Sequence, residues 1–336
     1  MPYWRFRGLR FRVEPTGEPR GALIDATVRA VDDPALPPSL GLRPQLGSLR
    51  LLDDPAGFPL PTLGDREALR AAWERLAALE AGRSLAERFV GETICLIYAP
   101  IEDLGGKEAA LARGENEGAV SLTGIRFLPL RCPECNADLD ASPGALGLGC
   151  SNCGRLWWFG AGEPVAIDYE LGGSANGAAV ALPFWKIGFQ AEGLPLSDQG
   201  DLMQHAGAYA RASAASGLPL HVFVPGFKVH PASMLRISRQ LTCLELPEPV
   251  EGARGCGLRF EPVRLSATEA AEALLVVLAG MLRSPRQMRL QLPHASIRPV
   301  SLSLRYQVFH PSGRDLVEAS SGYAIPKASI SFGANL

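Results

Sequence analysis

The alternation of apolar and polar residues predicts a chain rich in short strands. Runs of apolar and β-branched residues, bounded by Gly or Pro, predict strands over residues 28–31, 92–98, 220–224, 289–292 and 301–308. The same alternation continues through the first dozen residues, where basic and apolar side chains take turns. We therefore expect sheets to form most of the framework.

Three segments predict helices instead. Apolar residues recur every three to four positions over residues 65–81, and good helix formers fill residues 266–282. Ser266 and Glu269 form a capping-box pattern at the start of the second segment. A third helix is expected over residues 196–215. Together with the strands, these helices predict an α+β fold.

Patterns in the first part of the chain recur in the last part in the same order. The sequence PYWRF at residues 2–6 is matched by PFWKI at residues 183–187: proline, aromatic, tryptophan, basic, apolar. One of the helices at 65–81 and 266–282 follows each of them. A Leu-x-Tyr strand motif then follows each helix, at residues 96–98 and 304–306. This conserved order predicts an internal duplication that produces two related, strand-rich modules.

Four of the seven cysteines form a metal-ligand pattern. Cys132, Cys135, Cys150 and Cys153 give C-x2-C-x14-C-x2-C, in which two tight knuckles complete a tetrahedral thiolate site for zinc. With the knuckles CPEC and CSNCG, residues 128–160 resemble the zinc-ribbon family. The resemblance implies one structural Zn²⁺ bound by these four cysteines. The alternatives are two disulfides, which are rare in the cytosol, or a redox-active CxxC, for which one motif would suffice.

The cysteine motif also divides the chain. We expect an N-terminal α+β module over residues 1–127, the zinc ribbon over 128–160, a Gly-rich linker over 161–178 and a C-terminal α+β module over 179–336. Four thiolates leave no open coordination position, so the predicted metal is structural and not catalytic.

Composition restricts the classes of function. Hydrophobic residues make up 47% of the chain, and the formal net charge is −2, which argues for a packed core and against a protein that coats nucleic acid. The 36 Gly and 28 Pro among 336 residues exclude a coiled coil. The longest apolar run, residues 273–282, is about half the ~20 residues that cross a bilayer. Since no signal peptide is visible either, we expect a soluble cytoplasmic protein without a transmembrane segment.

Four arginines alternate with apolar residues in the opening strand: Arg5, Arg7, Arg10 and Arg12. A row of guanidinium groups beside aromatic rings can bind phosphate, RNA or anionic lipid. The favoured interpretation is a solvated strand face paired with the acids that follow, Glu14, Asp32 and Asp33.

Trp157 and Trp158 form a second candidate surface for a ligand or partner. Consecutive residues of a strand point to opposite faces, so at most one of the two packs against the cysteine knuckles. The other is either covered by a neighbouring module or exposed for a partner.

Asp198, Asp201 and His205 share one face of the predicted helix, because they are spaced i, i+3 and i+7. Two carboxylates and an imidazole can bind a metal or perform acid–base chemistry. Short polar residues also collect at helix starts, where they cap free N–H groups, and this is the favoured interpretation.

Known catalytic motifs do not occur. The sequence has no GxxxxGK[ST] phosphate loop, no Rossmann glycine pattern after a strand, no HExxH and no GxSxG. We therefore predict a non-enzymatic cytoplasmic adaptor or assembly protein that binds a protein partner. One alternative is a nucleic-acid-binding protein that uses the ribbon and the arginine-rich strand. A second is an enzyme with its site between the two halves.

Overall fold

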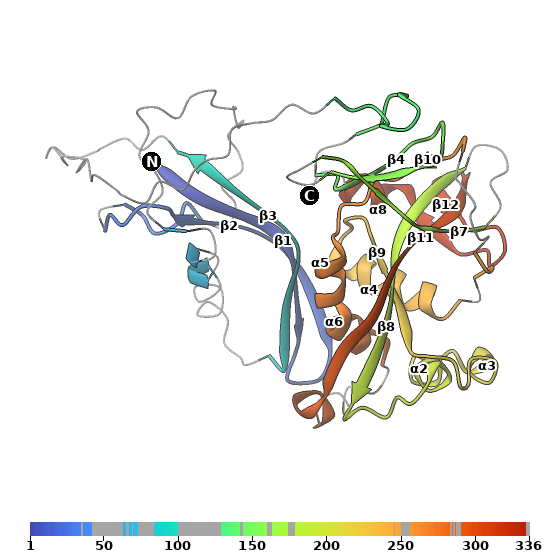
Figure 1. The fold of residues 1–336 in the computed structure, drawn as a ribbon. Helices are drawn as coiled ribbons and strands as arrows, with labels where there is room; N and C mark the ends of the chain where they lie inside the picture. The colour runs from blue at the N-terminus through green and yellow to red at the C-terminus, as the bar shows by residue number, and fades with distance from the viewer. Residues whose placement is uncertain are drawn as a thin grey trace, which may run out of the picture. The chain divides into compact units, whose positions relative to one another are not determined.

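The computed structural model describes residues 1–34, 36–41, 63–64, 67–68, 70–72, 84–99, 129–141, 144–159, 163–173, 179–244, 246–249, 256–282, 284, 286 and 290–333. This part of the chain is strand-rich with several sheets and helices, which confirms the α+β class (Figure 1). The chain divides into two compact units. The smaller unit contains Met1–Gly8, Ile24–Gly82 and Glu92–Phe127, and the larger unit contains Leu9–Leu23, Arg83–Gly91 and Leu128–Leu336.

A three-stranded sheet is formed by the first strands of the chain. Strands β1 (Pro2–Val13), β2 (Pro19–Arg29) and β3 (Ala86–Tyr98) lie in the order β2-β1-β3. The core of the smaller unit contains Trp4, Phe6, Val28, Ala30, Ala68 and Ala72. Of the helix predicted over residues 65–81, residues 67, 68 and 70–72 are helical, and the rest lies outside the described residues.

A chain of hydrogen bonds connects β1 to the helix in the smaller unit. The Ala30 N–H donates to the Pro2 carbonyl at 3.0 Å, and the Leu63 N–H donates to the Ala30 carbonyl at 3.1 Å. The Trp4 indole N–H donates to the Leu63 carbonyl at 2.7 Å. The tryptophan thereby holds the backbone just ahead of the helix against the first strand.

The larger unit is built around two long antiparallel strands, β8 (Val180–Glu192) and β11 (Ser296–Ser312). They pair from Phe309 opposite Val180 to Ser296 opposite Glu192, with a β-bulge between Pro299 and Ser301. The shorter strands of this sheet are β7 (Glu170–Gly172), β9 (His221–Pro225), β10 (Arg259–Phe260), β12 (Asp315–Val317) and β13 (Ala324–Pro326).

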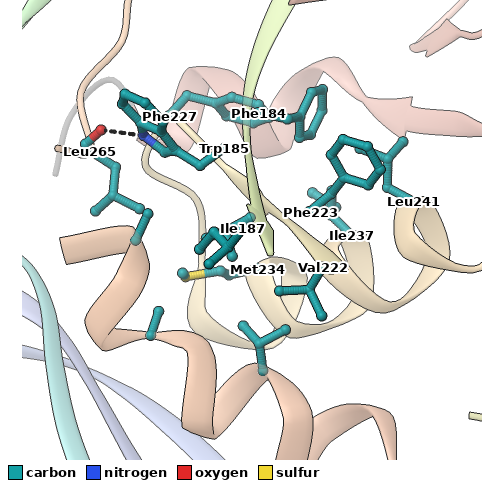
Figure 2. Packing of buried hydrophobic residues seen from close by; sticks show 14 of the residues in the cluster. Phe184, Trp185, Ile187, Val222, Phe223, Phe227, Met234, Ile237, Leu241 and Leu265 are labelled. Atoms are coloured by element: carbon teal, nitrogen blue, oxygen red, sulfur yellow. Dashed lines mark hydrogen bonds between the residues drawn. The ribbon is translucent and has the colours of Figure 1, made fainter. Parts of the chain in front are cut away.

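Helices α4 (Pro231–Thr242) and α6 (Leu274–Met281) pack against each other and against β9. Figure 2 shows the core beneath them, which includes Ile187 and Val222 of the sheet and Met234 and Ile237 of α4. The remaining helices are α2 (Gln199–His205), α3 (Tyr209–Ala212), α5 (Ala267–Glu272), the 3-10 turn η1 (Leu292–His294) and α8 (Lys327–Gly333). Within the described ranges, no helix has the length and apolar character required to cross a membrane.

The larger unit contains a second chain of hydrogen bonds. The Gly226 N–H donates to the Pro183 carbonyl at 2.8 Å, and the Leu265 N–H donates to the Gly226 carbonyl at 3.0 Å. The Trp185 indole N–H donates to the Leu265 carbonyl at 2.8 Å (Figure 2). Here, too, a tryptophan on the central strand holds the backbone ahead of a helix, α5.

The helix predicted over residues 266–282 is present as α5 and α6, which meet at Ala273. The capping box is confirmed: the Ser266 hydroxyl accepts the Glu269 N–H at 3.2 Å, and the Glu269 carboxylate accepts the Ser266 N–H at 2.8 Å.

Replacing Ser266 with alanine is expected to destabilise the protein by about 1 kcal/mol, because the Glu269 N–H loses its acceptor. Urea unfolding of the purified variant measures this change. Ser266→Asn, which restores an acceptor at the same position, should recover most of the loss. A Ser266→Ala variant with an unchanged midpoint would contradict the assigned role.

Two predictions of secondary structure are wrong. The helix expected over residues 196–215 is divided into α2 and α3, because the backbone passes through the left-handed region at Gly207, with φ 78°. The strand expected over residues 289–292 is helical at residues 290 and 291, and Leu292 begins η1.

The segment expected as a linker, residues 161–178, carries ordered strands in its described part. Strand β6 (Val165–Ile167) pairs with β5 (Leu156–Trp158), which pairs with β4 (Gly147–Gly149) in a third sheet. Strand β7 pairs in parallel with β11 from Glu170 opposite Arg305. Residues 174–178 lie outside the described residues.

Candidate metal centre

The first cysteine knuckle is closed by two backbone hydrogen bonds. The Cys132 N–H donates to the Ala137 carbonyl, and the Asn136 N–H donates to the Cys132 carbonyl, both at 2.8 Å. This tight loop carries the chain through the left-handed region at Asn136, with φ 59°. Asparagine tolerates this conformation better than most residues with a side chain.

The second knuckle repeats the first, eighteen positions along the printed sequence. The Cys150 N–H donates to the Arg155 carbonyl at 2.7 Å, and the Gly154 N–H donates to the Cys150 carbonyl at 2.8 Å. Gly154, with φ 71°, takes the place of the asparagine in the first loop. Each knuckle therefore presents its two sulfurs to the same point.

The four sulfur atoms lie within 4.8 Å of one another. The Cys132 and Cys153 Sγ atoms are 3.6 Å apart, and those of Cys135 and Cys150 are 3.5 Å apart. A tetrahedral ion with Zn–S bonds of ~2.3 Å places its sulfurs about 3.8 Å apart, whereas a disulfide requires about 2.05 Å. All four cysteines are free thiols, and their spacing fits a metal ion.

Hydrogen-bond donors surround the sulfurs. The Trp157 indole N–H donates to the Cys132 Sγ at 3.2 Å. The Asn152 side chain, followed by the Ala137 N–H, lowers the pKa of Cys135 to about 6. Burial raises the pKa of Cys153 to about 12. The thiols therefore differ in acidity, and a bound cation would favour the thiolate form of all four.

The two tryptophans beside the cysteines pack in two different hydrophobic clusters. They lie on β5 (Leu156–Trp158), which pairs with β4 (Gly147–Gly149). Trp157 packs in the cluster of the cysteines, while Trp158 packs against the main core of the larger unit. Trp158 is half-buried, so the main core covers part of its side chain.

The cysteine-containing segment is joined to the rest of the larger unit by backbone pairing. The Leu146 N–H donates to the Val263 carbonyl at 2.7 Å, and the Val263 N–H donates to the Gly147 carbonyl at 3.0 Å. A Cβ atom at Gly149 would lie 2.3 Å from the Phe260 ring, so only glycine allows this close approach. The Tyr169 hydroxyl adds a bond of 2.6 Å to the Gly154 carbonyl.

The arginines of β1 are engaged in ion pairs. Arg5 is 8% exposed and contacts Asp25 at 2.5 Å, while Arg10 is 5% exposed and contacts Glu87. Arg12 contacts Glu14 at 3.3 Å, one of the acids expected as partners, but the expected solvated face is wrong for Arg5 and Arg10, which are buried.

Arg7, the remaining arginine of that row, is half-buried. Asp25 and Glu87 were not among the acids expected as partners. They lie on β2 and β3, which flank β1, and strand pairing was needed to identify them.

Asp198 and Asp201 act at the start of α2. The Asp198 carboxylate accepts the Asp201 N–H at 2.9 Å and the Gly217 N–H at 2.7 Å, and the Gly217 bond is the main cause of its lowered pKa. The Asp201 carboxylate accepts the Ser197 N–H at 2.8 Å. His205 lies in the last turn of α2. Among the described residues, the four cysteines are the group that can hold a metal, and these three are not part of such a group.

No family model matches the chain, and no curated protein or solved structure is significantly similar to it. The chemistry of the site therefore rests on its own donor set and geometry.

Proposed function

We propose that the protein is a cytoplasmic, non-enzymatic adaptor in which the four cysteines hold one structural Zn²⁺ as a zinc ribbon. Sulfur donors at tetrahedral spacing are the set that zinc prefers in structural sites. With all four positions taken by thiolates, the ion has no place for water or a substrate. The pairing of the ribbon with Val263 and the Gly149–Phe260 contact support a role in holding the larger unit together.

The observation that carries the adaptor function is the exposed first half of β11. Residues 296–302 are exposed apart from Ile297, and in the described chain they pair with β8 alone. Val300 is 59% exposed and Leu302 is 42% exposed. An exposed strand edge that carries apolar side chains is a typical acceptor for a strand of another protein.

A native pull-down of the tagged full-length protein tests this function. We expect a stoichiometric protein partner that is lost from the double variant Val300→Asp, Leu302→Asp, because carboxylates on this strand oppose burial in an interface. Leu218→Asp is the matched control, since Leu218 is 50% exposed and lies outside β11. A protein that elutes without a partner, or a partner that the double variant retains, would rule out the adaptor function at this surface.

The two other functions have less support. Arg5 and Arg10 are buried in ion pairs, so the arginine-rich strand does not favour binding of nucleic acid. For an enzyme, Asp198 and Asp201 offer little support, because both carboxylates accept N–H groups at the start of a helix.

We also propose that the two halves are copies of one ancestral module. The two series of hydrogen bonds described above support this origin, because each runs in the same order through a proline, a small residue (Ala30 or Gly226), a leucine and a tryptophan. In the later half, Leu304 pairs with Trp185 and Tyr306 with Pro183. The Ala99 N–H donates to the Met1 carbonyl, which brings the Leu-x-Tyr motif of β3 alongside the same part of β1.

A further inference from the structure

A cavity of about 690 Å³ lies in the larger unit. It is walled by the end of α2 with α3, by the C-terminal half of α4 and by the turn at residues 321–323. Three arginines line it, Arg211, Arg236 and Arg239, and no aspartate or glutamate does. A concentration of positive charge in a concave site attracts an anionic ligand.

Two of these arginines donate hydrogen bonds to backbone carbonyls, and each uses only part of its guanidinium group. The Arg211 Nη1 donates to the Cys243 carbonyl at 2.9 Å, and the Arg239 Nη2 donates to the Ala206 carbonyl at 2.7 Å. These carbonyls lie at the C-caps of α4 and α2, where positive charge stabilises the helix end. A guanidinium group has five N–H donors, so most of them stay available to a ligand.

Arg236 is exposed on α4 and lines the same cavity as the other two arginines. The ion pairs found among the described residues include none of the three arginines. Three like charges on two helices, one on α3 and two on α4, repel one another, and an anion bound among them would offset this repulsion.

The turn at residues 321–323 adds neutral donors and is held rigidly. Glu318, which is 1% exposed, accepts the Ser321 N–H at 2.7 Å and the Ser321 and Ser320 hydroxyls at 2.6 and 2.8 Å. This buried carboxylate is therefore used inside the turn. Burial raises the pKa of Tyr323 to about 12, so its hydroxyl keeps its proton near neutral pH.

Apart from Gln240, most of the remaining wall is apolar, and it includes Pro19, Leu235 and Leu244. The volume falls in the range of roughly 300–1,000 Å³ that is typical of small-molecule sites. Guanidinium groups from α3 and α4 can approach one ligand from several directions. This arrangement suits the tetrahedral, multiply charged phosphate group better than a single planar carboxylate.

We propose that this cavity binds a phosphorylated small molecule of about nucleotide size, whose phosphates contact Arg211, Arg236 and Arg239 and whose apolar part lies on Leu235 and Leu244. The site is separate from the cysteine cluster and from the exposed half of β11, and the inference goes beyond the adaptor function. No motif in the sequence predicted such a small-molecule ligand.

Calorimetric titration of the full-length protein with ADP, pyrophosphate and citrate tests the proposal. ADP should bind once per chain. Replacing Arg236 with glutamine should weaken this binding roughly 10- to 100-fold, the effect of losing one hydrogen bond to a charged group. Arg211→Gln should act in the same direction. Arg314→Gln is the matched control, since it removes an exposed arginine that does not line the cavity.

Each titrant addresses one part of the assignment. ADP binding more tightly than pyrophosphate would support the apolar wall, and equal affinity would overturn that part. Citrate binding more tightly than both would overturn the phosphate class. The absence of ADP and pyrophosphate binding at millimolar concentration, or equal weakening in Arg314→Gln, would overturn the site itself. A thermal melt of Arg236→Gln that matches the wild type shows that any loss is not due to unfolding.

Discussion

Replacing Cys150 with serine is expected to abolish metal binding and unfold the cysteine-containing segment. The Cys150 side chain is buried among the other sulfurs, and three thiolates cannot complete the tetrahedral site. Structural zinc contributes an apparent ~10–16 kcal/mol in small zinc-binding peptides, which is comparable with the whole stability of a typical domain. Elemental analysis should give one zinc per chain for the wild type and none for the variant.

The consequences should extend beyond the cysteines, because Val263 and Phe260 contact this segment. Limited proteolysis should cut the variant within residues 129–159 under conditions that leave the wild type intact. Cys256→Ser is the control: Cys256 is exposed and lies outside the cluster, so its loss should leave the zinc content unchanged. Well under one zinc per wild-type chain, or full zinc content in the Cys150→Ser variant, would contradict the assignment.

Truncating Trp185 to alanine should cost about 3–5 kcal/mol, the usual range for a large buried aromatic side chain. Trp185 is 7% exposed, packs in the main core, and holds the Leu265 carbonyl through its indole N–H (Figure 2). Both the packed ring and the hydrogen bond disappear in the variant. The free energy of unfolding, measured in urea, gives the magnitude.

Trp185→Phe separates the two contributions, because it keeps an aromatic ring but leaves the Leu265 carbonyl without its donor. We expect an intermediate loss of about 1–3 kcal/mol for the unsatisfied carbonyl. Tyr209→Ala is the matched surface control, since Tyr209 is 68% exposed, and it should change stability by less than about 0.5 kcal/mol. Equal urea midpoints for Trp185→Ala and the wild type would exclude the proposed role of this residue.

The structural features that could be predicted from the sequence were those formed by residues close together in the chain. The cysteine spacing identified the group that could hold a metal, because each knuckle needs only six consecutive residues to close, from Cys132 to Ala137 in the first. The capping box at Ser266 was equally local. In both cases the residues that make the interaction also carry the sequence pattern.

Features that depend on distant segments could not be predicted in the same way. The partners of Arg5 and Arg10 became evident only once β2 and β3 were known to flank β1. The arginines of the cavity lie on two helices and carry no shared motif. A single glycine, Gly207, was enough to divide a predicted helix, because it allowed the backbone to enter the left-handed region.

The division of β1 between the two units has a consequence for the order of events during synthesis. Leu9 and Phe11 are buried in the main core of the larger unit, and Val13 packs with Ala279 and Leu292. Ala279 and Leu292 are translated more than two hundred and fifty residues after Val13. The C-terminal end of β1 must therefore stay protected, by local structure or by a chaperone, until residues 279–292 have been translated.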